Sequence, residues 1–256
     1  MRIRVHVTTT ARQIPWPDVH RPGRSIIYWL LGRADRELAA RIHEHGWGPH
    51  GLAPFGYCPP VFPDAPHTPG VYAAGGHGWF EVGTPIPAVA RALATALTHT
   101  PTIRWGSVEL AVSRLDLCTP PPGLDRGRIV WRTATPVVLK NGSPGSQTWI
   151  LPGEHGWEGR LGLNLRRKAA TLGLPDDLTV LRLLWAGAKR AHVVASGSDG
   201  KKHGARARVL LRGHPDVLRA LWCWGLGEAT SAGFGWVEDP APSVNATTVP
   251  VEAAAC

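Results

Sequence analysis

The stretch T-P-P-P-G-L-D-R-G-R-I-V-W-R-T-A-T-P-V-V-L (residues 119–139) divides the chain into two parts of similar length. Three consecutive prolines lack backbone N–H donors, so residues 119–124 cannot form regular structure and are the best candidate for a linker. Residues 128–139 read as a strand. The sequence therefore predicts a second folding unit that begins directly after the linker.

The part before the linker begins with a strand. In residues 2–9, the apolar side chains Ile3, Val5 and Val7 alternate with polar ones, which is the period of a half-buried strand. Ser25 is expected to cap the next helix, and Gly46 to end the one after it. The further elements predicted here are helices at 24–33, 35–45 and 86–98 and strands at 54–60, 77–84 and 106–117.

The order of elements beyond the linker resembles that of the first part. The pair Asn141-Gly142 follows the strand at 128–139 and is a strong hairpin signal. The remaining predicted elements are helices at 158–171 and 215–224, a long hairpin of 181–195 with 204–212, and a strand at 234–238. Residues 239–256 read as a flexible tail.

Two successive units of strands and helices predict an α+β fold made of tandem ferredoxin-like (RRM-like) βαββαβ domains. The expected domains are residues 1–120 and 125–238, followed by the tail at 239–256. Such sandwiches leave one sheet face free, and RNA-recognition modules use that face to bind nucleic acid.

The charge of the chain is concentrated in one stretch. Residues 160–212 contain twelve Lys or Arg and three Asp, which equals the net charge of +9 of all 256 residues. A basic surface gathered in one region indicates an acidic partner such as nucleic acid, although a solvated face is the plainer alternative. The twelve Trp suit large cores or surfaces on which bases stack.

The four cysteines are scattered, without a C-x-x-C pair, so the sequence implies neither a zinc ribbon nor a disulfide framework. The N-terminal residues read as a strand and not as a signal peptide, and no apolar run approaches the roughly 20 residues that span a bilayer. We therefore expect a cytoplasmic protein that does not contact membranes.

A glycine-rich loop, G-L-G-E-A-T-S-A-G-F-G-W, occupies residues 225–236. It is not a dinucleotide-binding fingerprint, because Thr230 replaces the third glycine and the loop leads from a helix to a strand. NAD and FAD are therefore excluded, and no cofactor is expected. Glycines without Cβ atoms suit a close approach to phosphates, although a tight connection without a ligand explains them equally well.

Three passages resemble one family. The glycine positions Gly225, Gly227, Gly233 and Gly235 with Phe234 resemble the C-terminal signature of the repeat-associated RNA-binding superfamily of CRISPR systems. The stretch 26–46, which ends in I-H-E-H-G, and the strand T-P-V-V-L-K (135–140) are similar to segments of that superfamily's repeat-processing endoribonuclease, the Cas six family. The passages occur in the family's order, so the resemblance spans about residues 1–238.

The resemblance implies a metal-independent catalytic site. Members of the family use a His at the I-H-E position, often with a Tyr and a basic residue, and the matching positions are His43, Tyr28 and His50. His43 lies in the last turn of its helix, where the macrodipole favours the protonated form. A His suits the proton transfers of RNA cleavage, and Tyr can donate. Some relatives carry Lys where His50 stands, so the cation of the site is the weakest assignment.

Plainer explanations exist for each of these residues. A His near a helix C-terminus is often only a favourable partner of the helix end. Tyr28 could belong to the core, and His43, His45 and His50 could together hold a metal ion, although only Glu44 offers a nearby carboxylate.

The long hairpin around residues 189–212 is the predicted RNA-binding element. Period-two spacing places Arg206 and Arg208 on one face, a row suited to a phosphate backbone. The other basic residues expected to contact RNA are Lys189, Arg190, Lys201 and Lys202. Such contacts position RNA without reading its sequence.

Two rival functions accompany the nuclease hypothesis. A non-catalytic RNA-binding subunit of a CRISPR effector complex would use the same fold but would not need Tyr28 and His43. A metal-dependent nuclease would lose its activity in EDTA. The expected partner is CRISPR repeat RNA, as a stem-loop or a single strand. The sequence leaves open whether the chain forms a homodimer or joins other effector subunits.

Overall fold

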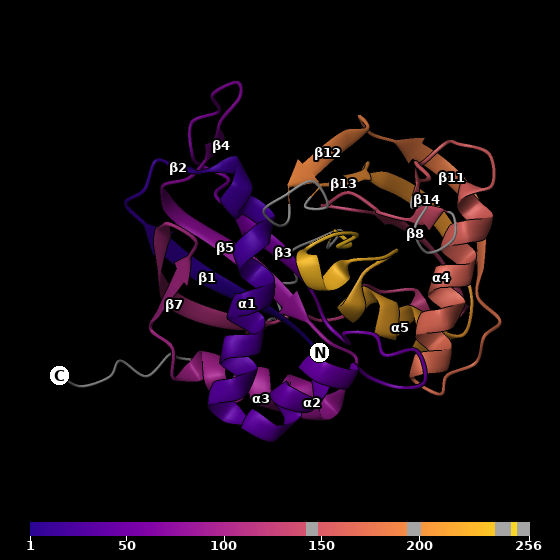
Figure 1. Cartoon of the computed structure of the whole chain (residues 1–256), viewed down its shortest axis with the longest axis horizontal. Coiled ribbons are helices and arrows are strands. Elements are labelled where there is room, and N and C mark those ends of the chain that lie inside the picture. Colours follow the sequence, from indigo (N-terminus) through magenta and orange to yellow (C-terminus); the bar gives the residue numbers. More distant parts are fainter. Residues whose placement is uncertain (142–147, 194–200, 239–246, 250–256) are drawn as a thin grey trace.

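A computed structural model describes residues 1–141, 148–193, 201–238 and 247–249. It consists of two α+β units that lie side by side (Figure 1), the N-terminal one in indigo to magenta and the C-terminal one in orange to yellow. The predicted turn residue Gly142, the residues 194–200 at the tip of the hairpin and most of the predicted tail lie outside the described residues.

The N-terminal unit contains the predicted ferredoxin-like sheet. Its main strands are β1 (Arg2–Thr9), β3 (Gly56–Val61), β5 (Gly76–Gly83) and β7 (Val108–Leu117). They lie in the order β7-β1-β5-β3, which is the fourth-first-third-second order of a βαββαβ sandwich. The predicted strand at 106–117 is the second arm of a hairpin that begins with β6 (Thr102–Trp105). A short two-stranded sheet, β2 (Gln13–Ile14) with β4 (Tyr72–Ala73), is added beside it.

Three helices complete this unit, namely α1 (Trp16–Ala34), α2 (Arg36–His45) and α3 (Pro87–Thr98). The predicted alternation of β1 is confirmed, because Ile3, Val5 and Val7 are buried in one cluster with Leu30 of α1 and Leu93 of α3. The sheet thus buries one face under the helices and leaves the other face toward the C-terminal unit.

The boundary between α1 and α2 orients the two helices. The predicted boundaries of α2 are confirmed: the Asp35 carboxylate accepts a hydrogen bond from the Leu38 N–H at 2.9 Å, and Gly46 ends the helix at φ 69°. The predicted start of α1 at residue 24, capped by Ser25, is wrong, since the helix begins at Trp16. Pro17 suits the first turn, where an N–H would have no partner, and α1 continues through Pro22.

The C-terminal unit is a ferredoxin-like sandwich with a reduced fourth strand. Strands β8 (Arg128–Arg132), β11 (Thr179–Ala186) and β14 (Ala207–Arg212) lie in the order β11-β14-β8 and pack on helices α4 (Trp157–Thr171) and α5 (Pro215–Trp224). The predicted strand at 234–238 is only an isolated bridge between Thr133 and Val237. The predicted strand at 128–139 ends at Arg132, because the backbone beyond it turns to bond the glycine-rich loop, as in the Gly235 N–H to Pro136 O bond.

Small hairpins extend this unit. The long basic hairpin continues past β11 and β14 as β12 (Arg190–Val193) and β13 (Lys201–Gly204), and β9 (Lys140–Asn141) pairs with β10 (Thr148–Trp149). Two 3-10 turns, η1 (Leu124–Arg126) and η3 (Thr230–Ala232), lie in the linker region and in the glycine-rich loop.

Hydrogen bonds between a buried ion pair of the first sheet and residues 236–237 join the two units. Arg2 of β1 bonds the Glu81 carboxylate of β5 and donates to the Val237 carbonyl at 2.8 Å. The indole N–H of Trp236 donates to the same carboxylate at 2.7 Å. In addition, the short strand β15 (Thr247–Val249), which falls in the predicted tail, pairs with β7. The C-terminal residues thus reach back to the first sheet.

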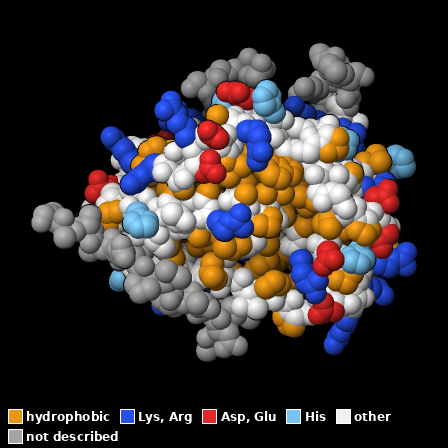
Figure 2. Space-filling view, turned by 90° about the horizontal axis from the view of Figure 1, so that it is seen from below, with side chains coloured by type: hydrophobic (Ala, Val, Ile, Leu, Met, Phe, Trp, Pro, Cys, Tyr) orange, Lys and Arg blue, Asp and Glu red, His pale blue; other side chains and the backbone are white. Residues whose placement is uncertain are grey.

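None of the helices in the described part of the chain has both the length and the apolar character of a membrane span. Figure 2 shows the molecule from below, where apolar side chains occupy the middle of the face and Lys and Arg lie mostly toward its rim.

Candidate active site

Helices α1 and α2 bring the predicted pair Tyr28 and His43 together. Their ring centroids lie 5.0 Å apart with planes at 77°, an edge-to-face contact. Tyr28 also packs edge-on against Phe55 at 5.3 Å, which fixes its ring from the other side. Tyr28 is half-buried and His43 is exposed, so both remain accessible from the surface.

The pair lines a cavity of about 390 Å³ between the two units. The walls come from α1 and α2, from α4 and from the glycine-rich loop. Besides Tyr28 and His43, the polar residues of this lining include Arg24, Asn164, Arg167, Lys168, Glu228 and Ser231. The cavity therefore combines aromatic and imidazole side chains with several basic residues and with the carboxylates of Glu44 and Glu228.

Arg24 is a cation beside Tyr28. Its guanidinium carbon lies 5.6 Å from the centroid of the Tyr28 ring. Burial raises the pKa of Tyr28, and the positive charge of Arg24 opposes this shift only in part. The phenol is therefore protonated at neutral pH and can donate a hydrogen bond.

His50 does not join this pair. Its side chain is exposed, and it does not contribute to the lining of the cavity. Its backbone carbonyl accepts a hydrogen bond from Arg167 at 3.4 Å. The positive charges in the cavity come instead from Arg24, Arg167 and Lys168, which sequence reasoning missed. The basic run Arg166-Arg167-Lys168 on a predicted helix was the sequence feature that could have indicated these residues.

Lys168 is a buried cation in the wall of the cavity. Only 3% of the residue is exposed, and its Nζ donates to the Gly225 carbonyl at 2.8 Å. The same atom lies 5.1 Å from the centroid of the Trp224 ring. Burial lowers the pKa of Lys168 to about 7, while the charge of Glu228 opposes the shift. Lys168 thus attaches α4 to the first residue of the glycine-rich loop.

Close packing explains the glycines of the loop. A Cβ on Gly235 would lie 1.7 Å from the Leu226 carbonyl oxygen, and one on Gly233 would lie 2.7 Å from the Tyr57 ring. Phe234 is buried and stacks on His20 with centroids 4.6 Å apart. Gly233, Phe234 and Gly235, which were predicted to contact RNA, therefore determine the shape of the loop. The residues of the loop that line the cavity are 227–231.

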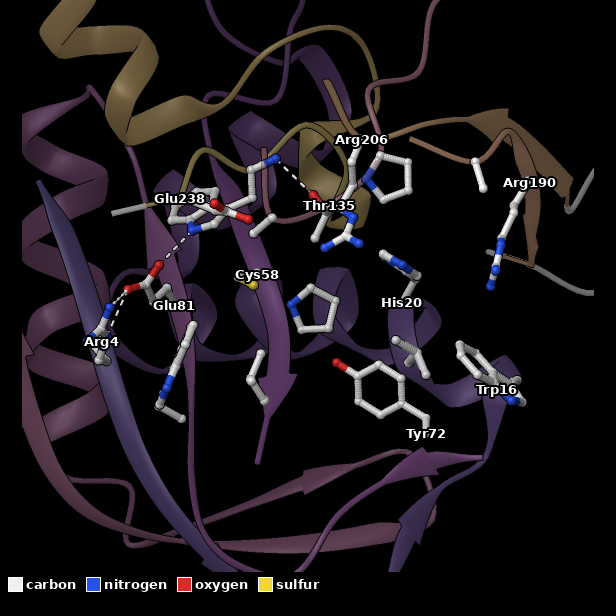
Figure 3. Close-up of a pocket in the computed structure, with 18 of the residues that line it drawn as sticks. Arg4, Trp16, His20, Cys58, Tyr72, Glu81, Thr135, Arg190, Arg206 and Glu238 are labelled. Atoms are coloured by element: carbon white, nitrogen blue, oxygen red, sulfur yellow. Dashed lines mark hydrogen bonds and ion pairs between the residues drawn. The ribbon is translucent and has the colours of Figure 1, made fainter. Parts of the chain in front are cut away.

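Two predicted RNA contacts, Arg190 and Arg206, line a second cavity of about 840 Å³. It lies between the open face of the first sheet and the C-terminal unit. In Figure 3, Arg206 and Arg190 approach from the C-terminal unit, whereas Trp16 and Tyr72 lie on the N-terminal side. The lining combines basic and aromatic side chains.

The remaining predicted RNA contacts are spread along the C-terminal unit. Lys189 pairs with Glu154 at 3.1 Å, and Lys201 is exposed. Arg208 is exposed on the outer face of β14 and does not line the second cavity, which Arg206 does line, so the expected row of Arg206 and Arg208 on one face stays a prediction.

Lys202 connects the hairpin to the first cavity. It is half-buried over the Trp149 ring, with Nζ 5.5 Å from the centroid. Burial lowers the pKa of Lys202, and the positive charges of Lys140 and Arg24 add to this, whereas Glu228 opposes it. Because Arg24 and Glu228 line the first cavity, the arm of the basic hairpin lies close to it.

Within the described residues, no group of three or more His, Cys, Asp or Glu side chains is placed to hold a metal ion. His43, His45 and His50, considered above as ligands, do not form such a group.

Residues 119–238 match the model of the family described as CRISPR associated protein Cas6, C-terminal. No curated protein matches the chain in sequence. A structure described as an RAMP protein binding different RNA substrates has a TM-score of 0.76 at 16% identity, covering 93% of this chain and 98% of its own. A CRISPR associated protein Cas6 has a TM-score of 0.73 at 19% identity, and the likeness covers 98% of this chain and 99% of that protein. A Cas6 product complex has a TM-score of 0.59 at 20% identity over 93% and 98%.

The likeness to these structures shows the fold of the chain, a pair of ferredoxin-like units. The family match covers residues 119–238, so the C-terminal unit is similar to the C-terminal part of Cas6 proteins.

Proposed function

We propose that the chain is an endoribonuclease that binds CRISPR repeat RNA in a precursor transcript and cleaves it without a metal ion. The observation that carries this proposal is the Tyr28–His43 contact in a cavity that also contains Arg24, Arg167 and Lys168. A purely structural RNA-binding subunit has no need of such a pair. One similar structure is described as binding RNA and another as a product complex, which supports RNA as the substrate.

The chemistry follows from the groups in the cavity. The 2′-oxygen attacks the adjacent phosphorus and loses its proton, while the bond from phosphorus to the 5′ oxygen breaks and that oxygen gains a proton. His43 performs one of these proton transfers, because a neutral imidazole can accept a proton and an imidazolium can donate one. The protonated phenol of Tyr28 and the charge of Arg24 stabilise the phosphorane. The products are a 2′,3′-cyclic phosphate and a 5′-OH.

The RNA path follows the cations on either side of this cavity. Lys202 of the basic hairpin lies near the first cavity, and Arg190 and Arg206 line the larger cavity between the units. Phosphate contacts from these side chains would position the strand at His43. The predicted domains, residues 1–120 with the catalytic His and 125–238 with the hairpin and the glycine-rich loop, are each one side of this path.

Cleavage of the cognate repeat RNA in excess EDTA tests the proposal. We expect the wild-type protein to cleave and His43→Ala to be slower by roughly 10²- to 10⁴-fold with RNA binding retained. His67→Ala, an exposed histidine of the same unit, is the matched control and should cleave like the wild type. Binding without cleavage by the wild type would favour the effector-subunit alternative, and cleavage restored only by added metal would favour the metal-dependent one.

A further inference from the structure

The outer face of the C-terminal sheet carries an array of arginines that the catalytic cavity does not use. On β8 and β14 the buried residues Trp131, Val209 and Leu211 alternate with exposed or half-buried ones. The basic and aromatic residues of the outer face, called here the arginine face, are Arg128, Arg132, Arg182, Arg208, Arg212 and Trp185, and the apolar pair Val130 and Leu210 lies between the two arginine pairs. None of them lines either of the two cavities described above.

The strand register places like charges opposite one another. Arg128 is the direct neighbour of Arg212, and Arg132 is the direct neighbour of Arg208. Like charges directly across a sheet destabilise it. Among the described residues, Arg132 has one carboxylate partner, Glu238 at 3.4 Å, and the other four arginines make no ion pair. The face therefore lacks the negative charge that would compensate it.

An aromatic ring lies within this array. Trp185 on the edge strand β11 is 41% exposed and is the neighbour of Arg208. The Arg132 guanidinium lies 5.5 Å from the centroid of its ring. Register shifts in β11, between Val180 and Arg182 and between Leu183 and Trp185, accompany the placement of Trp185 on the outer face.

We propose that the arginine face binds a single-stranded segment of RNA, with phosphates on the two arginine pairs and a base stacked on Trp185. The charge of the face calls for a polyanion, and a stacking ring among cations is typical of sites for unpaired nucleic acid. The two pairs are four residues apart along each strand, or about 13 Å, so they contact different phosphates. The identification of the ligand as RNA rests on the proposed function. The location of the site follows from the strand register alone.

The test measures binding of a fluorescently labelled twelve-nucleotide oligouridylate, which is unpaired, to three proteins. The wild type should bind. Arg128→Ala/Arg212→Ala should bind at least tenfold more weakly, and its slope of log affinity against log salt should fall by about 1.4. Arg91→Ala/Arg104→Ala removes two exposed arginines of the N-terminal unit, for which the described residues show no ion pair, and should bind like the wild type. Trp185→Ala should weaken binding about tenfold, and Trp185→Phe should restore most of it.

Several results would overturn the inference. These are no binding by the wild type, equal loss in the control variant, or displacement of the oligouridylate by polyglutamate as readily as by unlabelled RNA, which would indicate an acidic protein partner. The fold is monitored by thermal unfolding, where Arg128→Ala/Arg212→Ala should be at least as stable as the wild type because it removes a repulsion. In a further outcome, the wild type fails to cleave the repeat RNA while the arginine substitutions still weaken oligouridylate binding. That result would contradict the proposed function and support the arginine face as a binding site.

Discussion

The His43 imidazole meets the Tyr28 ring edge to face at 5.0 Å, across the junction between two helices. Asp35 caps the second helix at this junction, and Gly46 ends it one turn after His43. The contact thus depends on local sequence signals, whereas the cations around it come from α1 and from a helix more than 100 residues away.

Tyr28→Phe should separate packing from chemistry. The ring keeps its contacts with Phe55 and His43, so the stability should change little, whereas the phenol that we assign to the phosphorane is lost. We expect cleavage to be slower by about 10- to 100-fold with RNA affinity within a factor of about three. Single-turnover rates under saturating protein measure this, and an unchanged rate would remove Tyr28 from the chemistry.

Lys168 should make stability depend on pH. Its pKa in the folded protein is about 7, below the value of 10.5 for a free lysine, so the unfolded chain binds more protons between these values. Stability should therefore rise with pH from about 7 to about 10.5, by at most about 1.4 kcal/mol per unit. Lys168→Met should lack this rise. Urea unfolding at pH 6.5, 8 and 9.5 measures the difference, and parallel curves for both proteins would contradict it.

Glu81 should stabilise the junction of the two units. Burial raises the pKa of Glu81, but Arg2, Arg4 and the Trp236 N–H outweigh this and lower it. Its contribution is therefore full above the ordinary Glu pKa and is lost as pH falls through the lowered value. Glu81→Ala should cost about 3–5 kcal/mol, because it leaves buried arginine unpaired. Glu154→Ala, which removes a half-buried carboxylate that pairs with Lys189 and accepts from the Leu151 N–H, is the control and should cost far less.

Gly235→Ala should disrupt the glycine-rich loop. The new Cβ would lie 1.7 Å from the Leu226 carbonyl oxygen at φ +64°. Gly153→Ala is a matched control, since Gly153 also has a positive φ of 88° but open space around it. We expect backbone strain to lower the free energy of unfolding of both variants by roughly 1–3 kcal/mol. Only Gly235→Ala should lose further stability and cleave more slowly. An equal loss of stability in the two variants would contradict this prediction, because it would mean that the glycine-rich loop shifts to accommodate the new Cβ.

Local patterns in the sequence predicted much of the fold. The alternation of Ile3, Val5 and Val7 and the Asp35 cap concern neighbouring residues, so they could be read directly. The start of α1 could not, because prolines that usually end helices lie inside it. The strand expected at 234–238 is reduced to the bridge between Thr133 and Val237, because the Trp236 N–H donates to the Thr135 hydroxyl and the Gly235 N–H donates to the Pro136 carbonyl.

The site divided in the same way. Tyr28 and His43 lie on adjacent helices, and the resemblance to a family identified them. The role of Lys168 depends on the docking of α4 against Gly225, which no periodicity encodes. The arginine face depends on strand register and on two register shifts in β11, which single-sequence patterns do not specify.

The chemistry of the RNA ends tests the central claim most directly. Repeat RNA incubated with the wild-type protein in excess EDTA is analysed by mass spectrometry, beside the same RNA with a 2′-deoxy nucleotide at the cleavage position. Attack by the 2′-oxygen in the Tyr28–His43 cavity predicts a 2′,3′-cyclic phosphate, a 5′-OH and an intact deoxy substrate. Products with a 5′-phosphate, or cleavage of the deoxy substrate, would contradict the account.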